Sequence, residues 1–150
     1  MKFDRRAFIT ASAALVGVAL LPKRFAWAEL SDDVADALRA AIADREVVEG
    51  GIVLDAPDIA QNGASVPVGV FVESPMTAAD HVREIRLFAT RNPSPQIGAF
   101  RFTPASGRAE ATTRIRLAEG QEIIVLAETS DGRLLRVSAT VEVTVGGCVT

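Results

Sequence analysis

Residues 121–145, QEIIVLAETSDGRLLRVSATVEVTV, carry the strongest β-strand signal in the chain. Residues 122–128 form a nearly continuous apolar run, as in a central strand covered on both faces. Ser130-Asp131-Gly132 is typical of a tight hairpin turn. Between residues 134 and 145, one face of the expected last strand is apolar, with Leu135, Val137, Ala139, Val141, Val143 and Val145. This segment therefore predicts a β-hairpin built on a buried strand.

The same period of two continues upstream of this hairpin. Every second residue of 66–72 is valine, and in residues 108–117 the odd positions suit a core while the even positions are charged or polar. Further strands are expected in residues 82–90 and around Phe100 and Phe102. Six or seven short strands separated by turns predict a mostly β protein, an immunoglobulin-like antiparallel β-sandwich. Because only 5% of the residues are aromatic, aliphatic side chains must fill most of its core.

A helix is expected before the sandwich. Ser31-Asp32-Asp33 resembles a helix N-terminus, and apolar residues follow at helical spacing until about Glu46, before Gly50-Gly51. One side of this helix is apolar, so it should pack against another surface. We therefore expect an N-terminal helix in residues 29–50, a β-sandwich in 51–145 and a flexible C-terminal arm in 146–150.

The first 28 residues have the features of an export signal. Arg5 and Arg6 precede an uncharged stretch over residues 7–21, and Ala26-Trp27-Ala28 offers a signal peptidase site. This arrangement resembles a twin-arginine signal, which directs folded bacterial proteins to the periplasm. An uncharged stretch of that length is short against the roughly 20 residues that span a bilayer. We expect cleavage after Ala28, a periplasmic protein and no stable insertion in the membrane.

The charge and the reactive side chains exclude several classes of function. After residue 28 the chain has eleven basic and eighteen acidic residues, which disfavours nucleic-acid binding and suits a basic protein partner. His81 is the only histidine, so a zinc site built from several imidazoles is excluded. No glycine-rich phosphate loop is present, and no spacing pairs the carboxylates Asp55, Asp58, Glu73 and Asp80. We expect neither a metal, a cofactor nor catalytic residues, and hence no enzyme.

Cys148 is the only cysteine and lies two residues before the last residue given, directly after Gly146 and Gly147. A single cysteine forms no internal disulfide. The two glycines predict a mobile arm, on which the thiol would extend on the order of 10 Å from the sheet. No charged side chain nearby lowers the thiol pKa, so this cysteine suits a handle on which other proteins act. An incidental tail cysteine and an interchain disulfide remain alternatives.

Several segments together resemble one known family. They are Ala56-Pro57-Asp58-Ile59-Ala60-Gln61-Asn62-Gly63, Val66-Pro67-Val68, Ser74-Pro75-Met76, Asn92-Pro93, Phe102-Thr103-Pro104-Ala105-Ser106-Gly107, Thr113-Arg114-Ile115-Arg116-Leu117, Ala127-Glu128 with Ser130-Asp131-Gly132, and Val145-Gly146-Gly147-Cys148. Their order, with the twin-arginine signal, resembles the SoxY family of thiosulfate-oxidation carriers. SoxY proteins are the sulfur-binding half of the SoxYZ heterodimer.

The resemblance implies a sulfur carrier with Cys148 as its covalent site and Gly146 and Gly147 as its flexible neck. It implies that a c-type cytochrome couples thiosulfate to this cysteine, and that sulfur-processing enzymes then release sulfate and remove the remaining sulfur. It also implies a SoxZ-like partner subunit, which we expect to dock on the helix and an acidic face of the sandwich. The family tail continues with two glycines after the cysteine, whereas Val149 and Thr150 follow here.

Two other classes of function are weighed against the carrier. An immunoglobulin-like interaction module would use Cys148 only for an interchain disulfide. A thiol enzyme such as a peroxidase would need a base or a cation fixed beside the thiolate. No such residue is near Cys148 in the sequence.

Overall fold

The computed structural model describes residues 30–147. The predicted export signal and Cys148 lie outside the described residues. The chain between them forms one α-helix, one short 3-10 helix and nine strands. These are α1 (Asp32–Ile42), β1 (Val47–Glu49), β2 (Ile52–Asp55), β3 (Ile59–Ala60), β4 (Val66–Val72), β5 (Val82–Ala89), β6 (Gln96–Arg101), η2 (Pro104–Ser106), β7 (Ala109–Ile115), β8 (Gln121–Thr129) and β9 (Leu134–Val143).

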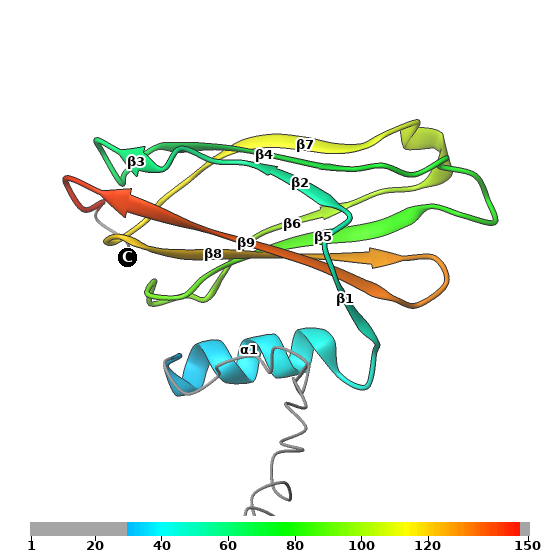
Figure 1. The fold of residues 1–150 in the computed structure, drawn as a ribbon, viewed down its shortest axis with the longest axis horizontal. Coiled ribbons are helices and arrows are strands. Elements are labelled where there is room, and N and C mark those ends of the chain that lie inside the picture. Colours follow the sequence, from blue (N-terminus) through cyan, green and yellow to red (C-terminus); the bar gives the residue numbers. More distant parts are fainter. Residues whose placement is uncertain (1–29, 148–150) are drawn as a thin grey trace, which may run out of the picture.

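The strands form two facing sheets, which confirms the predicted β-sandwich (Figure 1). The larger sheet has the order β1-β9-β8-β5-β6, with β3 also paired to β9, and the smaller sheet has the order β2-β4-β7. One detail differs from the antiparallel prediction, because β1 and β3 both run parallel to β9. The larger sheet is therefore mixed, while all the remaining pairs are antiparallel.

The alternation seen in the sequence fills the core between the two sheets. Val66, Val68, Val70 and Val72 of β4 are all buried there. Strand β8 lies between β9 and β5, and its apolar run serves two cores. Its odd residues from Ile123 to Ala127 point into the sandwich, while Ile124 and Leu126 point to the outer face. This double burial explains why the run lacks the alternation of the other strands.

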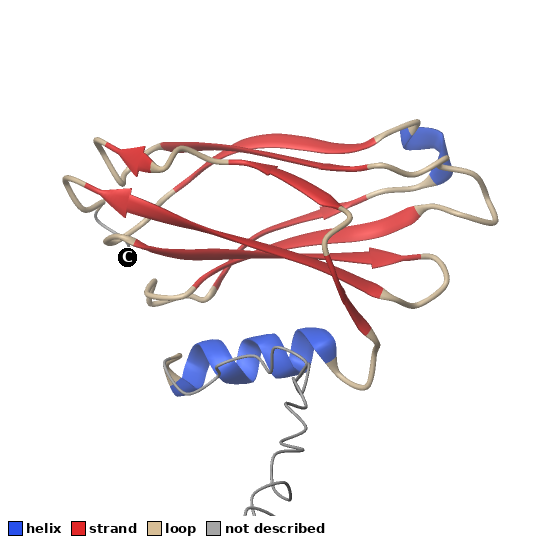
Figure 2. Ribbon diagram, viewed as in Figure 1, coloured by secondary structure: helices blue, strands red, loops and turns tan. Residues whose placement is uncertain are grey.

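Helix α1 covers the outer face of the larger sheet and makes a third layer (Figure 2). Val34, Leu38 and Ala41 pack on Phe88, Ile124, Leu126 and Leu134 of that sheet. Ser31 is the N-cap residue, although its side chain makes no capping hydrogen bond. The apolar face of α1 is therefore buried within the chain itself.

The helix ends at Ile42, before the Glu46 that the sequence suggested. Arg45 folds back and donates hydrogen bonds to the carbonyl oxygens of Ala41 and Ile42, at 3.0 and 3.3 Å, which satisfies the end of the helix. Gly50 and Gly51 lie further along and adopt positive φ angles of 93° and 76°. They form the turn at which the chain leaves β1 in one sheet and enters β2 in the other.

In the described part of the chain, no helix is long and apolar enough to cross a membrane.

Candidate functional site

The last described residues lie against the body of the sandwich. After β9, the amide of Thr144 donates to the carbonyl oxygen of Ala60 at 2.9 Å, and the carbonyl oxygen of Val145 accepts from the amide of Gly63 at 2.8 Å. The amide of Gly147 then donates to the carbonyl oxygen of Leu117 at 3.0 Å. We call Gly63, Leu117 and Ala118 the tail dock, because residues 145–147 lie against them.

The tail dock has no space for side chains at its glycines. A Cβ on Gly63 would lie 2.2 Å from the carbonyl oxygen of Leu117, and a Cβ on Gly146 would lie 2.3 Å from that of Ala118. A Cβ on Gly147 would lie 2.6 Å from the carbonyl carbon of Gly63. These distances are far shorter than a van der Waals contact. From the sequence we predict that Gly146 and Gly147 form a flexible neck. The structure adds a second reason for glycine at both positions, which is the close approach of the backbone to the tail dock.

A buried pair of amide side chains holds the loop that carries Leu117 and Ala118. Asn92 donates to the carbonyl oxygen of Arg116 at 2.8 Å and accepts from the amide of Ala118 at 3.0 Å. The side chain of Gln121 donates to the same Asn92 oxygen at 2.9 Å. Asn92 is 6% exposed and Gln121 is 3% exposed. Buried polar groups that satisfy one another fix a single loop conformation.

Four of the segments that support the family resemblance therefore meet at one end of the sandwich. They are the segment that ends in Gly63, the segment that begins with Asn92, the segment that ends in Leu117, and the tail. In the sequence, Gly63 and Asn92 stand out only as parts of motifs, and nothing there predicts that Gly63 contacts the tail or that Asn92 holds the loop of Ala118. The sequence offers two signals here, the Asn92-Pro93 pair and the Asn62-Gly63 pair. Both indicate turns, and neither identifies the distant residues that these segments contact.

The carboxylates and the histidine that we weighed as catalytic candidates in the sequence form no common site in the structure. Asp55, Asp58, Glu73 and Asp80 are all exposed. His81 is half-buried just before β5, with its Nδ1 atom 3.0 Å from the carbonyl oxygen of Thr77. Within residues 30–147, no group of three or more His, Cys, Asp or Glu side chains could hold a metal ion.

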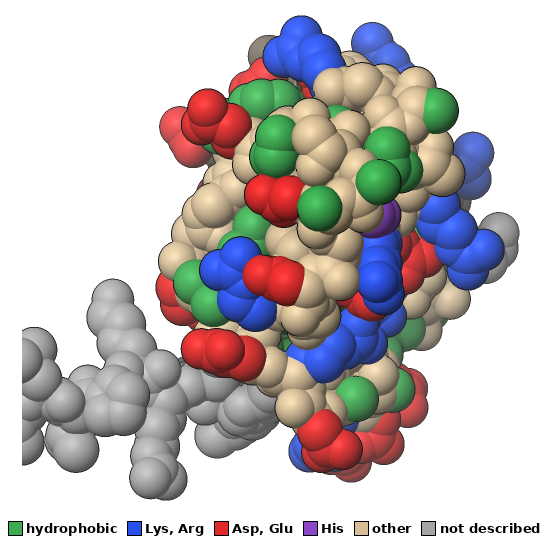
Figure 3. All heavy atoms as spheres, turned by 90° about the vertical axis from the view of Figure 1, so that its right-hand side faces the viewer, with side chains coloured by type: hydrophobic (Ala, Val, Ile, Leu, Met, Phe, Trp, Pro, Cys, Tyr) green, Lys and Arg blue, Asp and Glu red, His purple; other side chains and the backbone are tan. Residues whose placement is uncertain are grey.

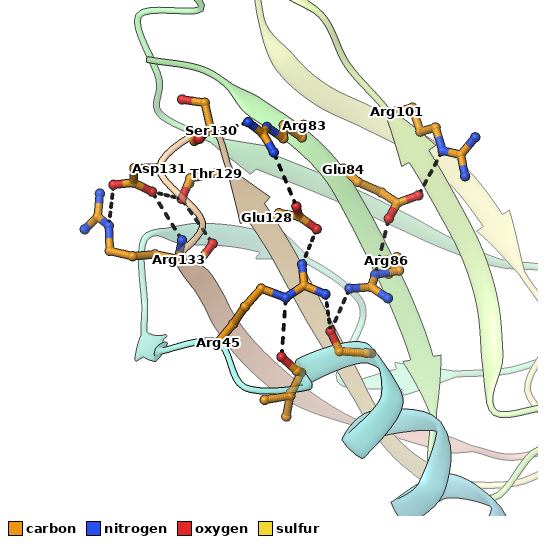
Figure 4. A network of polar contacts seen from close by, with 12 residues as sticks. Arg45, Arg83, Glu84, Arg86, Arg101, Glu128, Thr129, Ser130, Asp131 and Arg133 are labelled. Carbon is orange, nitrogen blue, oxygen red and sulfur yellow. Dashed lines mark hydrogen bonds and ion pairs between the residues drawn. The ribbon is translucent and has the colours of Figure 1, made fainter. Parts of the chain in front are cut away.

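The end of the sandwich opposite the tail carries a network of arginines and carboxylates (Figures 3 and 4). Glu128 of β8 binds Arg45 beside the helix and lies 3.9 Å from Arg83 of β5. Glu84 lies 3.1 Å from Arg101 and 3.5 Å from Arg86, and Arg86 also donates to the carbonyl oxygen of Ala41 at 2.9 Å. Through these contacts the network joins the end of α1 to the sheet.

The β8–β9 hairpin at that end contains a carboxylate with a shifted pKa. The Asp131 side chain accepts hydrogen bonds from the hydroxyl of Thr129 and from the guanidinium and amide of Arg133. These bonds favour the ionised form and lower the pKa of Asp131 from 3.8 to about 2, with the Thr129 bond as the largest cause. Asp131 is exposed and belongs to the turn, so the shift reflects hairpin structure.

Comparison with known proteins gives two kinds of similarity. Residues 38–148 match the family described as "Sulfur oxidation protein SoxY", so the matched region ends at Cys148. The structure is similar to that of the sulfur carrier protein SoxY from Chlorobium limicola f thiosulfatophilum, with 31% identity and a TM-score of 0.63. That similarity covers 75% of this chain and 97% of the Chlorobium chain. No curated protein sequence matches the chain.

Superoxide reductases share the fold at lower identity. The superoxide reductase (neelaredoxin) from Ignicoccus hospitalis is 19% identical with a TM-score of 0.56, covering 63% of this chain and 80% of that chain. A putative superoxide reductase from Thermotoga maritima is 23% identical with a TM-score of 0.53, covering 67% and 87%. At such identities the similarity shows a common β-sandwich and nothing about chemistry.

Proposed function

The chain belongs to the SoxY family of sulfur oxidation proteins, and from that premise we propose that it carries sulfur covalently on Cys148 in the periplasm. The observation that supports Cys148 most directly is the extent of the family match, which continues through this residue. Cys148 is also the only thiol in the chain, so no other side chain competes for the role.

The proposed loading step is an oxidative coupling with thiosulfate. The Cys148 thiolate forms a sulfur–sulfur bond with the outer sulfur of thiosulfate, which leaves a cysteine S-thiosulfonate and releases two electrons. A c-type cytochrome of the same pathway accepts those electrons. The chain supplies the sulfur atom that is modified, and the cytochrome supplies the oxidising power, so this protein acts as a carrier and not as the enzyme.

The proposed unloading begins with hydrolysis. Water attacks the terminal sulfonate, sulfate and two protons leave, and a cysteine persulfide stays on Cys148. Sulfur-processing partner enzymes then oxidise or accept the outer sulfur and regenerate the thiol. Each partner must reach the end of the sandwich where residues 145–147 lie on the tail dock.

We further propose a SoxZ-like subunit as the constant partner. The apolar face of α1 is buried on the larger sheet, so the helix offers a partner only its polar side. Exposed carboxylates lie along and just after that helix, at Asp32, Asp33, Asp36 and Asp44. A basic partner surface would complement them. Size-exclusion chromatography of residues 29–150, alone and with the partner subunit, tests this contact, and a chain that stays monomeric with the subunit present counts against it.

Export by the twin-arginine route completes the proposal. Arg5 and Arg6 form the signal motif, and cleavage after Ala28 would leave a chain that begins at Glu29. Transport of a folded protein would allow the partner subunit to cross the membrane together with this chain.

The deciding experiment measures the intact mass of the protein purified from cells grown on thiosulfate, before and after reduction. The expected result is one or more adducts with the mass of sulfur atoms or of a thiosulfate unit, all removed by the reductant. The Cys148→Ser variant should fold and bind its partner yet carry no adduct. Adducts on that variant, or only a disulfide between two chains in the natural protein, would overturn the assignment.

A further inference from the structure

Gly63 lies far from Cys148 in the sequence but contacts the residue that precedes it. The atoms of Gly63 meet Gly147 from two directions, since a Cβ on either glycine would collide with the backbone of the other. We propose that Gly63 is a positioning residue for the carrier thiol, because it holds Gly147 and so fixes the point at which Cys148 leaves the sandwich. This inference rests on the proposed function.

Three backbone hydrogen bonds join the tail to the body of the sandwich, and we call them the latch. The tail contributes the amides of Thr144 and Gly147 and the carbonyl oxygen of Val145, and the body contributes Ala60, Gly63 and Leu117 as partners. A fourth bond, from the amide of Leu117 to the carbonyl oxygen of Gly63 at 2.8 Å, joins the two parts of the body. The tail therefore lies on a preassembled surface.

The glycines of the latch are needed for space and not for an unusual backbone conformation. Gly50, Gly51, Gly107 and Gly132 have positive φ angles, whereas Gly63, Gly146 and Gly147 do not. Their φ angles therefore do not call for glycine, but a Cβ at any of the three positions would not fit. Gly146 and Gly147 share one steric requirement, which is the close approach of the tail to its dock. A Cβ on Gly63 would collide with Leu117 of the dock at 2.2 Å and with Gly147 of the tail at 2.8 Å, so this glycine allows both contacts.

The surface under the tail is rigid. Gly63 is buried, Leu117 is fully buried, and the Asn92–Gln121 pair holds the loop that follows Leu117. A site supported by packed and fully hydrogen-bonded residues keeps its geometry. The tail lies at the surface, whereas the dock belongs to the packed body of the sandwich. When thermal motion breaks the hydrogen bonds between them, the tail moves away and the dock stays in place.

The latch controls how far the thiol reaches. With Gly147 held, the Cα of Cys148 lies about 3.8 Å from that of Gly147. With the latch open, the free segment begins after Val143. Its five residues allow the Cα of Cys148 to lie up to roughly 17 Å from the Cα of Val143. The short reach suits the resting carrier, and the long reach suits delivery into a partner enzyme. The same glycines serve both states, because a residue without a Cβ fits the dock and moves freely once released.

The test uses Cys148 as the single attachment point for a nitroxide spin label on residues 29–150. Gly63→Ala should open the latch and shorten the rotational correlation time of the label several-fold, with the thermal unfolding of the sandwich still cooperative. Hydrogen exchange at the amide of Gly147 should accelerate about tenfold, since its hydrogen bond to Leu117 is lost. Gly98→Ala is the matched control, because a Cβ there meets only ordinary contacts at 3.8 Å or more.

A label that is equally mobile in the natural protein and in Gly63→Ala would overturn the proposal. So would an amide of Gly147 that exchanges at the free-chain rate in the natural protein, a result that needs no variant. If Gly63→Ala fails to fold, Gly147→Ala replaces it, because this residue lies outside the core and its Cβ would meet Gly63 at 2.6 Å. Neither readout requires a sulfur cargo on Cys148, so the latch and the carrier role can fail independently.

Discussion

Replacing Asn92 by alanine should be among the most damaging single changes near the tail dock. Its side chain makes three hydrogen bonds, with the carbonyl oxygen of Arg116, the amide of Ala118 and the side chain of Gln121. Alanine removes all three and leaves the partners in a region too buried for water to replace them fully. A lost hydrogen bond of this kind costs about 1 kcal/mol, which gives about 3 kcal/mol of unfolding free energy for Asn92→Ala.

Urea denaturation followed by circular dichroism measures this loss. With a slope of about 1.5 kcal/mol per molar urea, the midpoint of Asn92→Ala should fall by about 2 M. Asn62→Ala is the matched control at the same end of the sandwich. Asn62 is exposed and its side chain accepts one hydrogen bond, from the amide of Ala64 at 2.8 Å, so this variant should lose only about 0.5 kcal/mol.

The reasoning is refuted if Asn92→Ala loses no more stability than Asn62→Ala. A second readout addresses the link to the tail. If the amide pair supports the loop that receives Gly147, hydrogen exchange at the amide of Leu117 should also accelerate in Asn92→Ala. Unchanged protection there would show that the loop keeps its position without Asn92.

Three further changes have defined outcomes. Leu38→Ala should lower the unfolding free energy by about 3 kcal/mol in urea denaturation, because Leu38 is buried between the helix and the sheet. Ala40 is exposed, so Ala40→Ser should change this free energy by less than about 0.5 kcal/mol, and equal urea midpoints for the two variants would contradict the prediction. Because the pKa of Asp131 is lowered in the folded state, its ionised side chain stabilises the fold above pH 3.8, and this contribution is lost as the pH falls to about 2. The Tm of the natural protein should therefore approach that of Asp131→Asn between pH 3.8 and about 2, and a constant difference in Tm would contradict this. Replacing Arg5 and Arg6 together by lysine should leave uncleaved precursor in the cytoplasmic fraction, and normal periplasmic recovery would argue against the twin-arginine route.

Strand positions in the sandwich were largely predictable, because the direction of a side chain along a strand is a local property. The valines of residues 66–72 alternate in the sequence and are buried in the structure at the same positions. The run in residues 122–128 indicated a central strand, and β8 does lie between β9 and β5. The hairpin turn at residues 130–132 also needs only neighbouring residues.

Other elements depend on contacts that local patterns do not contain. Strands β1 and β3 have three and two residues, and both exist through parallel pairing with β9. So short a segment has no readable period, and its partner is distant in the chain. The end of α1 at Ile42 likewise shows no change in apolar spacing: the backbone leaves the helix at Ala43, where φ is 50°, and Arg45 returns to the helix carbonyls.

Residues 145–148 show most clearly what the sequence alone predicts and what only the tertiary structure decides. Residue types alone identified Cys148 as the only thiol and placed two glycines before it, which was enough to predict a carrier handle. A glycine in a sequence is ambiguous, however, since the absent Cβ serves either freedom of the backbone or close approach to another segment. The fold resolves the ambiguity by bringing Gly63 against Gly147, because the pairing of distant strands determines which segments meet.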